Sequence, residues 1–114
     1  MIVKAGDYRE ERRVIAGGEG EILLKHKFER EQMFGKSRLA AELVIAPGQS
    51  IGMHVHDPDA EIYYMLSGEL VSVNADGSEE PFLAGDAMLT GGGGMHGVRN
   101  DSDKDAVMLA IVML

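Results

Sequence analysis

The chain of 114 residues contains no cysteine and no tryptophan, and only three prolines. The absence of cysteine excludes disulfides and thiolate metal sites, which fits a reducing compartment such as the cytoplasm. The N-terminus lacks the apolar stretch of a signal peptide. The longest apolar run, residues 106–114, is far shorter than the roughly 20 residues that span a bilayer. We therefore expect a cytoplasmic protein with no membrane partner.

Positive charge is also scarce. The chain has 11 Lys and Arg against 19 Asp and Glu, a net charge of −8. Because no run of basic residues interrupts this excess, we expect no nucleic-acid partner. A small-molecule ligand remains compatible with the charge. The length predicts one domain with one core, covering residues 1–114.

Glycine is abundant, with 15 residues, and turn signals recur every few positions. The segments between them alternate polar and apolar residues, which predicts short strands and no helix longer than two turns. The charged run at 7–13 is expected to be a solvated loop or one helical turn. A succession of short strands joined by tight turns is typical of an all-β closed barrel or double sheet. The expected strands are 1–5, 22–28, 38–46, a histidine-bearing stretch near 54–56, 62–66, 70–73, 80–83, 87–90, 96–100 and 106–114.

The last expected strand, residues 106–114, is apolar on both faces. A barrel wall needs only one apolar face, so the outer face should pack beneath another segment or against a second subunit. We predict a homodimer.

Three histidines and one glutamate form a candidate metal site. His54 and His56 are two apart on a strand and so point to the same side. Glu61 begins the next strand and should reach them as a neighbour, and His96 could close the site from across the barrel. Imidazole and carboxylate suit Mn, Fe, Co, Ni, Cu or Zn, and four ligands leave open positions. The alternative is that these histidines are ordinary surface residues.

The spacing of these residues resembles the two conserved motifs of the cupin superfamily. The first motif spans 48–68 and the second 85–100, and the second departs from the family pattern at Gly91, where proline is usual. The residues that match the motifs are Gly48, His54, His56, Glu61 and Gly68, then Gly85, Gly93, His96 and Asn100. The resemblance implies a single cupin-type jelly-roll β-barrel (double-stranded β-helix), as in small single-domain bacterial or archaeal cupins. It also implies that His54, His56, Glu61 and His96 hold one divalent metal inside the barrel.

Other side chains could take part in the chemistry. Tyr63 shares a strand face with Glu61, so its hydroxyl could orient a ligand or act as an acid, or its ring could simply pack in the wall. Glu42 is expected to face solvent, and would be a candidate base only if it faced the cavity. His26 is expected to be a core or rim histidine rather than a proton shuttle. Methionines near the ligands, such as Met53 and Met95, could line the cavity or fill the core.

Cupins include enzymes and binding proteins, so the fold does not fix the function. We favour a metal-dependent enzyme of the oxygenase, decarboxylase or isomerase type that acts on a small oxygenated metabolite. The alternative is a non-catalytic small-molecule or sugar-binding protein that uses the metal to hold its ligand. A third possibility is a metal that only stabilises the barrel.

Overall fold

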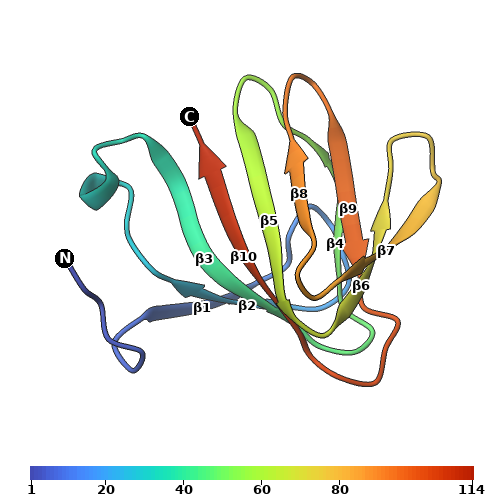
Figure 1. The fold of residues 1–114 in the computed structure, drawn as a ribbon, viewed down its shortest axis with the longest axis horizontal. Coiled ribbons are helices and arrows are strands. Elements are labelled where there is room, and N and C mark those ends of the chain that lie inside the picture. The colour runs from blue at the N-terminus through green and yellow to red at the C-terminus, as the bar shows by residue number, and fades with distance from the viewer.

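The fold is a barrel of two antiparallel sheets that face one another (Figure 1). The structure, a computed structural model, describes all 114 residues. One sheet has the strand order β1-β2-β3-β10-β5-β8 and the other β4-β9-β6-β7. The strands are β1 (Arg9–Arg13), β2 (Ile22–His26), β3 (Ser37–Ile45), β4 (Ser50–Val55), β5 (Ala60–Ser67), β6 (Glu69–Val73), β7 (Glu79–Leu83), β8 (Ala87–Thr90), β9 (Met95–Arg99) and β10 (Ala106–Met113). The all-β, two-sheet prediction is confirmed.

The N-terminal region differs from the prediction. Residues 1–5 form no strand, and the charged run instead contains β1, which pairs antiparallel with β2. Both outcomes correct the sequence-based expectation. An edge strand has solvent on most of its surface, so charged side chains can occupy it without a burial penalty. The only helical element is a single 3-10 turn, η1 (Glu31–Met33). This agrees with the prediction that no helix is longer than two turns.

The core lies between the two sheets and contains 16 buried apolar residues. Alternate residues of β2, β3 and β10 point inward, as the period of two requires. Ile22, Leu24, Ala41 and Met108 are fully buried. No helix in the structure is long and apolar enough to cross a membrane.

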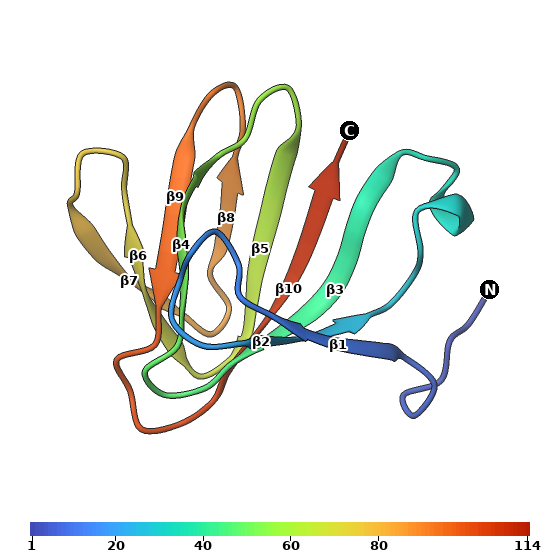
Figure 2. The same ribbon diagram turned by 180° about the vertical axis from the view of Figure 1, so that it is seen from behind.

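The segment between β1 and β2 folds back over β4 and closes one side of the barrel (Figure 2). Backbone hydrogen bonds hold it there: Gly52 N–H donates to the Ile15 carbonyl at 3.2 Å, and Ser50 N–H donates to the Glu19 carbonyl at 3.0 Å. The two chains approach so closely that a Cβ on Gly52 would lie 2.0 Å from the Ala16 carbonyl oxygen. Glycine is therefore required here, and the contact places residues 14–16 beside the barrel interior.

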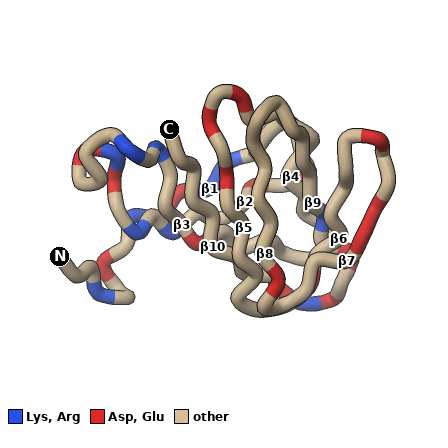
Figure 3. Tube along the Cα trace, turned by 45° about the horizontal axis from the view of Figure 1, so that its top comes forward, with Lys and Arg blue, Asp and Glu red and all other residues tan.

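Charge is distributed unevenly over the barrel. Residues 1–38 carry nine Lys and Arg against seven Asp and Glu, whereas the remaining residues carry two against 12. The blue segments in Figure 3 accordingly gather on the side formed by the N-terminal strands, and red segments mark the tips of the β4–β5 and β6–β7 turns. The side of the barrel built from β1 to β3 is thus its basic side.

Candidate metal centre

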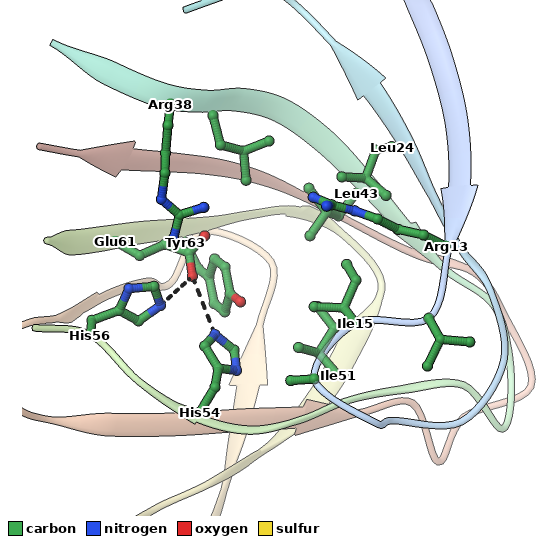
Figure 4. Close-up of a pocket in the computed structure, with 13 residues that line it drawn as sticks. Arg13, Ile15, Leu24, Arg38, Leu43, Ile51, His54, His56, Glu61 and Tyr63 are labelled. Carbon is green, nitrogen blue, oxygen red and sulfur yellow. Dashed lines mark ion pairs between the residues drawn. The ribbon is translucent and has the colours of Figure 1, made fainter. Parts of the chain in front are cut away.

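The four predicted ligands converge on one point inside the barrel. One potential ligand atom from each of His54, His56, Glu61 and His96 lies within 4.8 Å of all the others. His56, Glu61 and His96 are buried, and the His54 side chain is 24% exposed. Figure 4 shows the Glu61 carboxylate between His54 and His56. The structure therefore brings together a group of three histidines and one glutamate placed to bind a metal.

The strands that carry these ligands are arranged differently from the prediction. His96 on β9 is the direct cross-strand partner of His54 on β4, within the four-stranded sheet. Glu61 lies on β5, which belongs to the opposite sheet. The expected positions of Glu61 and His96 are therefore reversed: the histidine is the neighbour and the glutamate reaches across the barrel.

Hydrogen bonds at the outer nitrogen of each ring fix how the three imidazoles are oriented. His54 Nδ1 donates to the Gly52 carbonyl at 2.8 Å, and His56 Nδ1 donates to Asp59 Oδ1 at 3.0 Å. His96 Nδ1 pairs with Thr90 Oγ1 at 2.8 Å. Since the carbonyl and the carboxylate can only accept, the Nδ1 atoms of His54 and His56 carry the protons. Their Nε2 lone pairs therefore point toward the shared centre.

The inner atoms are close together, and the Nε2 atoms of His54 and His56 carry no proton. The Nε2 atoms of His96 and His54 are 2.8 Å apart, and those of His56 and His96 are 3.2 Å apart. Glu61 Oε1 lies 3.0 Å from His56 Nε2 and 3.1 Å from His96 Nε2, yet it is buried without a well-directed hydrogen bond. A cluster of acceptor atoms that face one another calls for a cation among them. The residues present thus fit a metal ion.

The electrostatics keep the glutamate ionised. Burial by itself would raise the pKa of Glu61, but its close approach to the imidazoles of His54, His96 and His56 lowers it to about 2. The nearby Glu61 carboxylate raises the pKa of His54, whereas burial lowers the pKa of His96. Glu61 therefore remains a carboxylate across the physiological pH range and is available as an anionic ligand.

The glycine run before His96 serves the site through the backbone. His56 N–H donates to the Gly94 carbonyl at 3.0 Å, and Gly93 N–H donates to the His56 carbonyl at 3.0 Å. Gly93 has a φ of 87°, which glycine adopts without strain. The run thus anchors the chain at His56, just beyond the end of β4.

A cavity of about 270 Å³ opens next to this group (Figure 4). Its wall includes His54, His56 and Glu61, the Tyr63 side chain, two arginines and mainly apolar residues. The two arginines and the apolar residues of this wall are Arg13, Arg38, Val14, Ile15, Ala16, Leu24, Leu39, Leu43 and Ile51. The cavity therefore combines the metal-binding group, positive charge and a largely apolar wall.

The structure places Tyr63 in this cavity, as strand parity predicted. Its side chain is 2% exposed, and its ring stacks on His96 with a centroid distance of 4.6 Å. Burial, with a smaller effect from Glu61, raises the pKa of Tyr63 well above its ordinary value. The phenol is therefore protonated near neutral pH and can donate a hydrogen bond.

The other candidates lie outside the cavity. Glu42 pairs with Lys27 at 2.6 Å and does not line the cavity, in line with the solvent-facing prediction. His26 is buried at the barrel rim and hydrogen-bonded to Glu11 at 2.7 Å, so the rim prediction is confirmed. The predicted methionine lining is wrong, because no methionine lines the cavity. Met53 and Met95 are exposed, and Met88 packs against the core, as the core-filling alternative predicted.

Four polar residues of the site were not identified from the sequence: Asp59, Thr90, Arg13 and Arg38. Asp59 accepts from His56 through one oxygen and from Arg38 Nη2 through the other, at 2.9 Å, so it links a ligand to a cavity arginine. Arg13 reaches the cavity from β1. A carboxylate three residues after His56 was a usable signal for Asp59. No nearby sequence feature predicts that the two arginines reach the cavity, because they enter the site through pairing between distant strands.

Comparisons with known proteins identify the class that the fold and site define. The family model described as "Cupin domain" matches residues 41–112, so the chain belongs to the cupin family. The jelly-roll prediction and the resemblance read from the two motifs are thereby confirmed.

Individual relatives have more specific descriptions than the family as a whole. The chain is 36% identical, over its whole length and 94% of the relative, to a protein of Thermotoga maritima named an oxalate-binding protein. It is similar, with a TM-score of 0.93 and 36% identity over 100% of this chain and 99% of the other, to a crystal structure from Thermotoga maritima described as a predicted oxalate decarboxylase. A polyketide cyclase from Streptomyces resistomycificus shares the fold, with a TM-score of 0.82 and 22% identity over 99% of this chain and 78% of the other.

Proposed function

We propose that the protein uses His54, His56, Glu61 and His96 to hold one divalent transition metal and binds a small carboxylate at its open coordination positions. The observation that carries the proposal is the convergence of three imidazole nitrogens and a buried carboxylate oxygen that lacks a donor. Imidazole and carboxylate donors suit Mn, Fe, Co, Ni, Cu or Zn. When bound, such an ion would supply a Lewis-acidic positive charge for anionic oxygens of a ligand. That all of 1–114 forms one cupin domain stays a prediction.

Residues of the cavity support a carboxylate ligand such as oxalate. Arg38 lines the cavity and bonds Asp59 through Nη2, which leaves other guanidinium N–H groups to meet an anion. Tyr63, protonated and buried beside Glu61, would donate to a ligand oxygen. The relative named an oxalate-binding protein, at 36% identity, supports the same class of ligand.

The metal content of the purified protein and calorimetric titration with oxalate test this proposal. We expect about one equivalent of metal and oxalate binding that depends on it. His96→Ala should lose both, whereas Arg38→Gln should keep the metal and weaken oxalate binding by roughly tenfold. His26→Gln, which changes the one histidine outside the group, is the matched control. Reloaded wild type that holds no more metal than His96→Ala would refute the proposal.

A second candidate function is a metal-dependent enzyme that decarboxylates such a ligand, and Tyr63 is the residue that favours it. Loss of carbon dioxide from a dicarboxylate leaves its electron pair on carbon, which must then take up a proton. The Tyr63 hydroxyl, kept protonated by burial, would donate that proton. Formate and carbon dioxide released from oxalate by loaded wild type, but not by Tyr63→Phe, would establish this activity. Retention of oxalate unchanged would leave binding as the function.

We also propose that the protein is a homodimer built on the outer face of the six-stranded sheet. Leu109 of β10 is the cross-strand partner of Tyr64 on β5. Ile111 of β10 pairs with Ile62 on β5, and Ile62 pairs on its other side with Leu89 of β8. These side chains form a continuous apolar stripe, and Tyr64 and Leu89 are 42% and 71% exposed. A second copy could bury this stripe by two-fold pairing. Light scattering should show a dimer for wild type and a monomer for Leu109→Lys. A monomeric wild type would refute it.

A further inference from the structure

The cavity next to the metal-binding group is much larger than oxalate requires. Its volume is about 270 Å³, many times the roughly 10–15 Å³ that a cavity needs to hold one water. Oxalate is two carboxylates joined directly, with no carbon between them, so chelation through both ends would fill only a fraction of this space. The rest of the cavity lies beyond Tyr63, on the side away from His56 (Figure 4).

The wall of this extra space is apolar. Leu24 and Leu43 contribute from the six-stranded sheet, and Ile51 contributes from β4. Ile15 completes the wall because the segment between β1 and β2 is bonded to β4 at Gly52. An unsubstituted polar ligand gains nothing from such a wall, whereas a hydrocarbon stem is stabilised by contact with it.

The far end of the apolar space carries a second positive charge. Arg13 extends into the cavity from the side opposite His56 (Figure 4). Its guanidinium makes no hydrogen bond to another side chain, and its carboxylate contact, Nε to Glu11 Oε1, is long at 3.9 Å. Its side chain is 51% exposed, so the guanidinium stands where the cavity meets solvent. An anion at that point would have five N–H donors available.

We infer that the ligand is longer than oxalate: it has a chelating carboxylate head, an apolar stem and a second anionic group that pairs with Arg13. A 2-oxo or 2-hydroxy dicarboxylate belongs to this class. The head occupies the open metal positions, the stem lies along the apolar wall beside Ile15, and the terminal carboxylate meets Arg13. This inference rests on the proposed metal-dependent binding of a carboxylate and specifies its ligand.

A titration series of 2-oxo acids, which share one chelating head, tests the inference, with oxalate as a separate reference. Metal-loaded wild type is titrated with oxalate, pyruvate, 2-oxopentanoate, 2-oxoglutarate and 2-oxoadipate. Lengthening the stem should tighten binding by roughly fourfold per buried methylene. The terminal carboxylate of 2-oxoglutarate should add roughly three- to tenfold over 2-oxopentanoate.

Two variants separate the stem from the terminal anion. Arg13→Gln should remove the advantage of 2-oxoglutarate over 2-oxopentanoate and leave the binding of oxalate and pyruvate unchanged. Ile15→Phe, which fills the apolar space from a partly buried position, should weaken the longer ligands and spare oxalate. If pyruvate binds as tightly as every longer 2-oxo acid while oxalate binds the loaded protein, the inference fails and the proposed function stands. If no carboxylate binds the loaded protein, both fail.

Discussion

The carboxylate of Asp59 should tune the affinity of the metal centre without contacting the metal. Its Oδ1 accepts from His56 Nδ1 at 3.0 Å, and its Oδ2 accepts from Arg38 Nη2 at 2.9 Å. The Asp59 side chain is only 16% exposed, so solvent does not replace these contacts readily. Loss of such a partner of a ligating histidine typically costs 10- to 100-fold in metal affinity.

Two substitutions divide that effect into charge and geometry. Asp59→Asn keeps an oxygen that can accept from His56 but removes the negative charge, and we expect about a tenfold loss, or ~1.4 kcal/mol. Asp59→Ala removes the acceptor as well and frees the ring to rotate, so the loss should approach 100-fold, or ~2.7 kcal/mol. Asp57→Asn, an exposed residue of the same loop, is the matched control.

Competition against a chelator of known affinity, with Zn or Co, measures these constants. The expected order of affinity is wild type and Asp57→Asn together, then Asp59→Asn, then Asp59→Ala. The reasoning would be refuted if all four proteins agreed within about twofold, a difference smaller than one lost hydrogen bond produces.

Three further predictions concern the frame around the site. Gly52→Ala should destabilise the protein by about 1–3 kcal/mol in urea unfolding, because its Cβ meets a carbonyl oxygen at 2.0 Å. Gly6→Ala, which meets nothing within 4 Å, should be neutral. Asn100→Ala should cost about 2–4 kcal/mol, since that buried amide makes four hydrogen bonds. The hydrogen bond from His26 lowers the pKa of Glu11. The stability it provides should therefore be present above about pH 4.3 and be lost at lower pH, and Glu11→Gln should flatten that part of the pH profile.

The ligand set could be predicted because it lies within two short stretches of sequence. His54, His56 and Glu61 are separated by one strand end and one tight turn, so their proximity follows from local geometry. His96 was assigned through the spacing of the second motif. The structure brings all four ligand atoms within 4.8 Å of one another, as that reasoning requires.

The relative placement of the strands could not be predicted, because alternation reveals which side a residue faces but not which strand lies beside it. The hairpin-like sequence between His56 and Glu61 suggested that β4 and β5 are neighbours. Instead β4 pairs with β9, about 40 residues away, and the chain crosses from one sheet to the other at the turn. For the same reason, Arg13 and Arg38 could not be assigned to the site, because the order of strands in the six-stranded sheet is what brings them to the cavity.

The division of ligands between the two sheets bears on whether a metal would serve structure or binding. Glu61 comes from one sheet, and the three histidines lie on strands of the other or just beyond the end of β4, so an ion at the centre would connect the two sides of the barrel. The core of 16 buried apolar residues, however, already joins the sheets independently of that centre. Hydrogen bonds to Gly52, Asp59 and Thr90 orient the three rings through the protein's own atoms. A centre that is oriented in advance and opens onto a cavity is suited to holding a ligand, and the apolar core gives the barrel a source of stability separate from that centre.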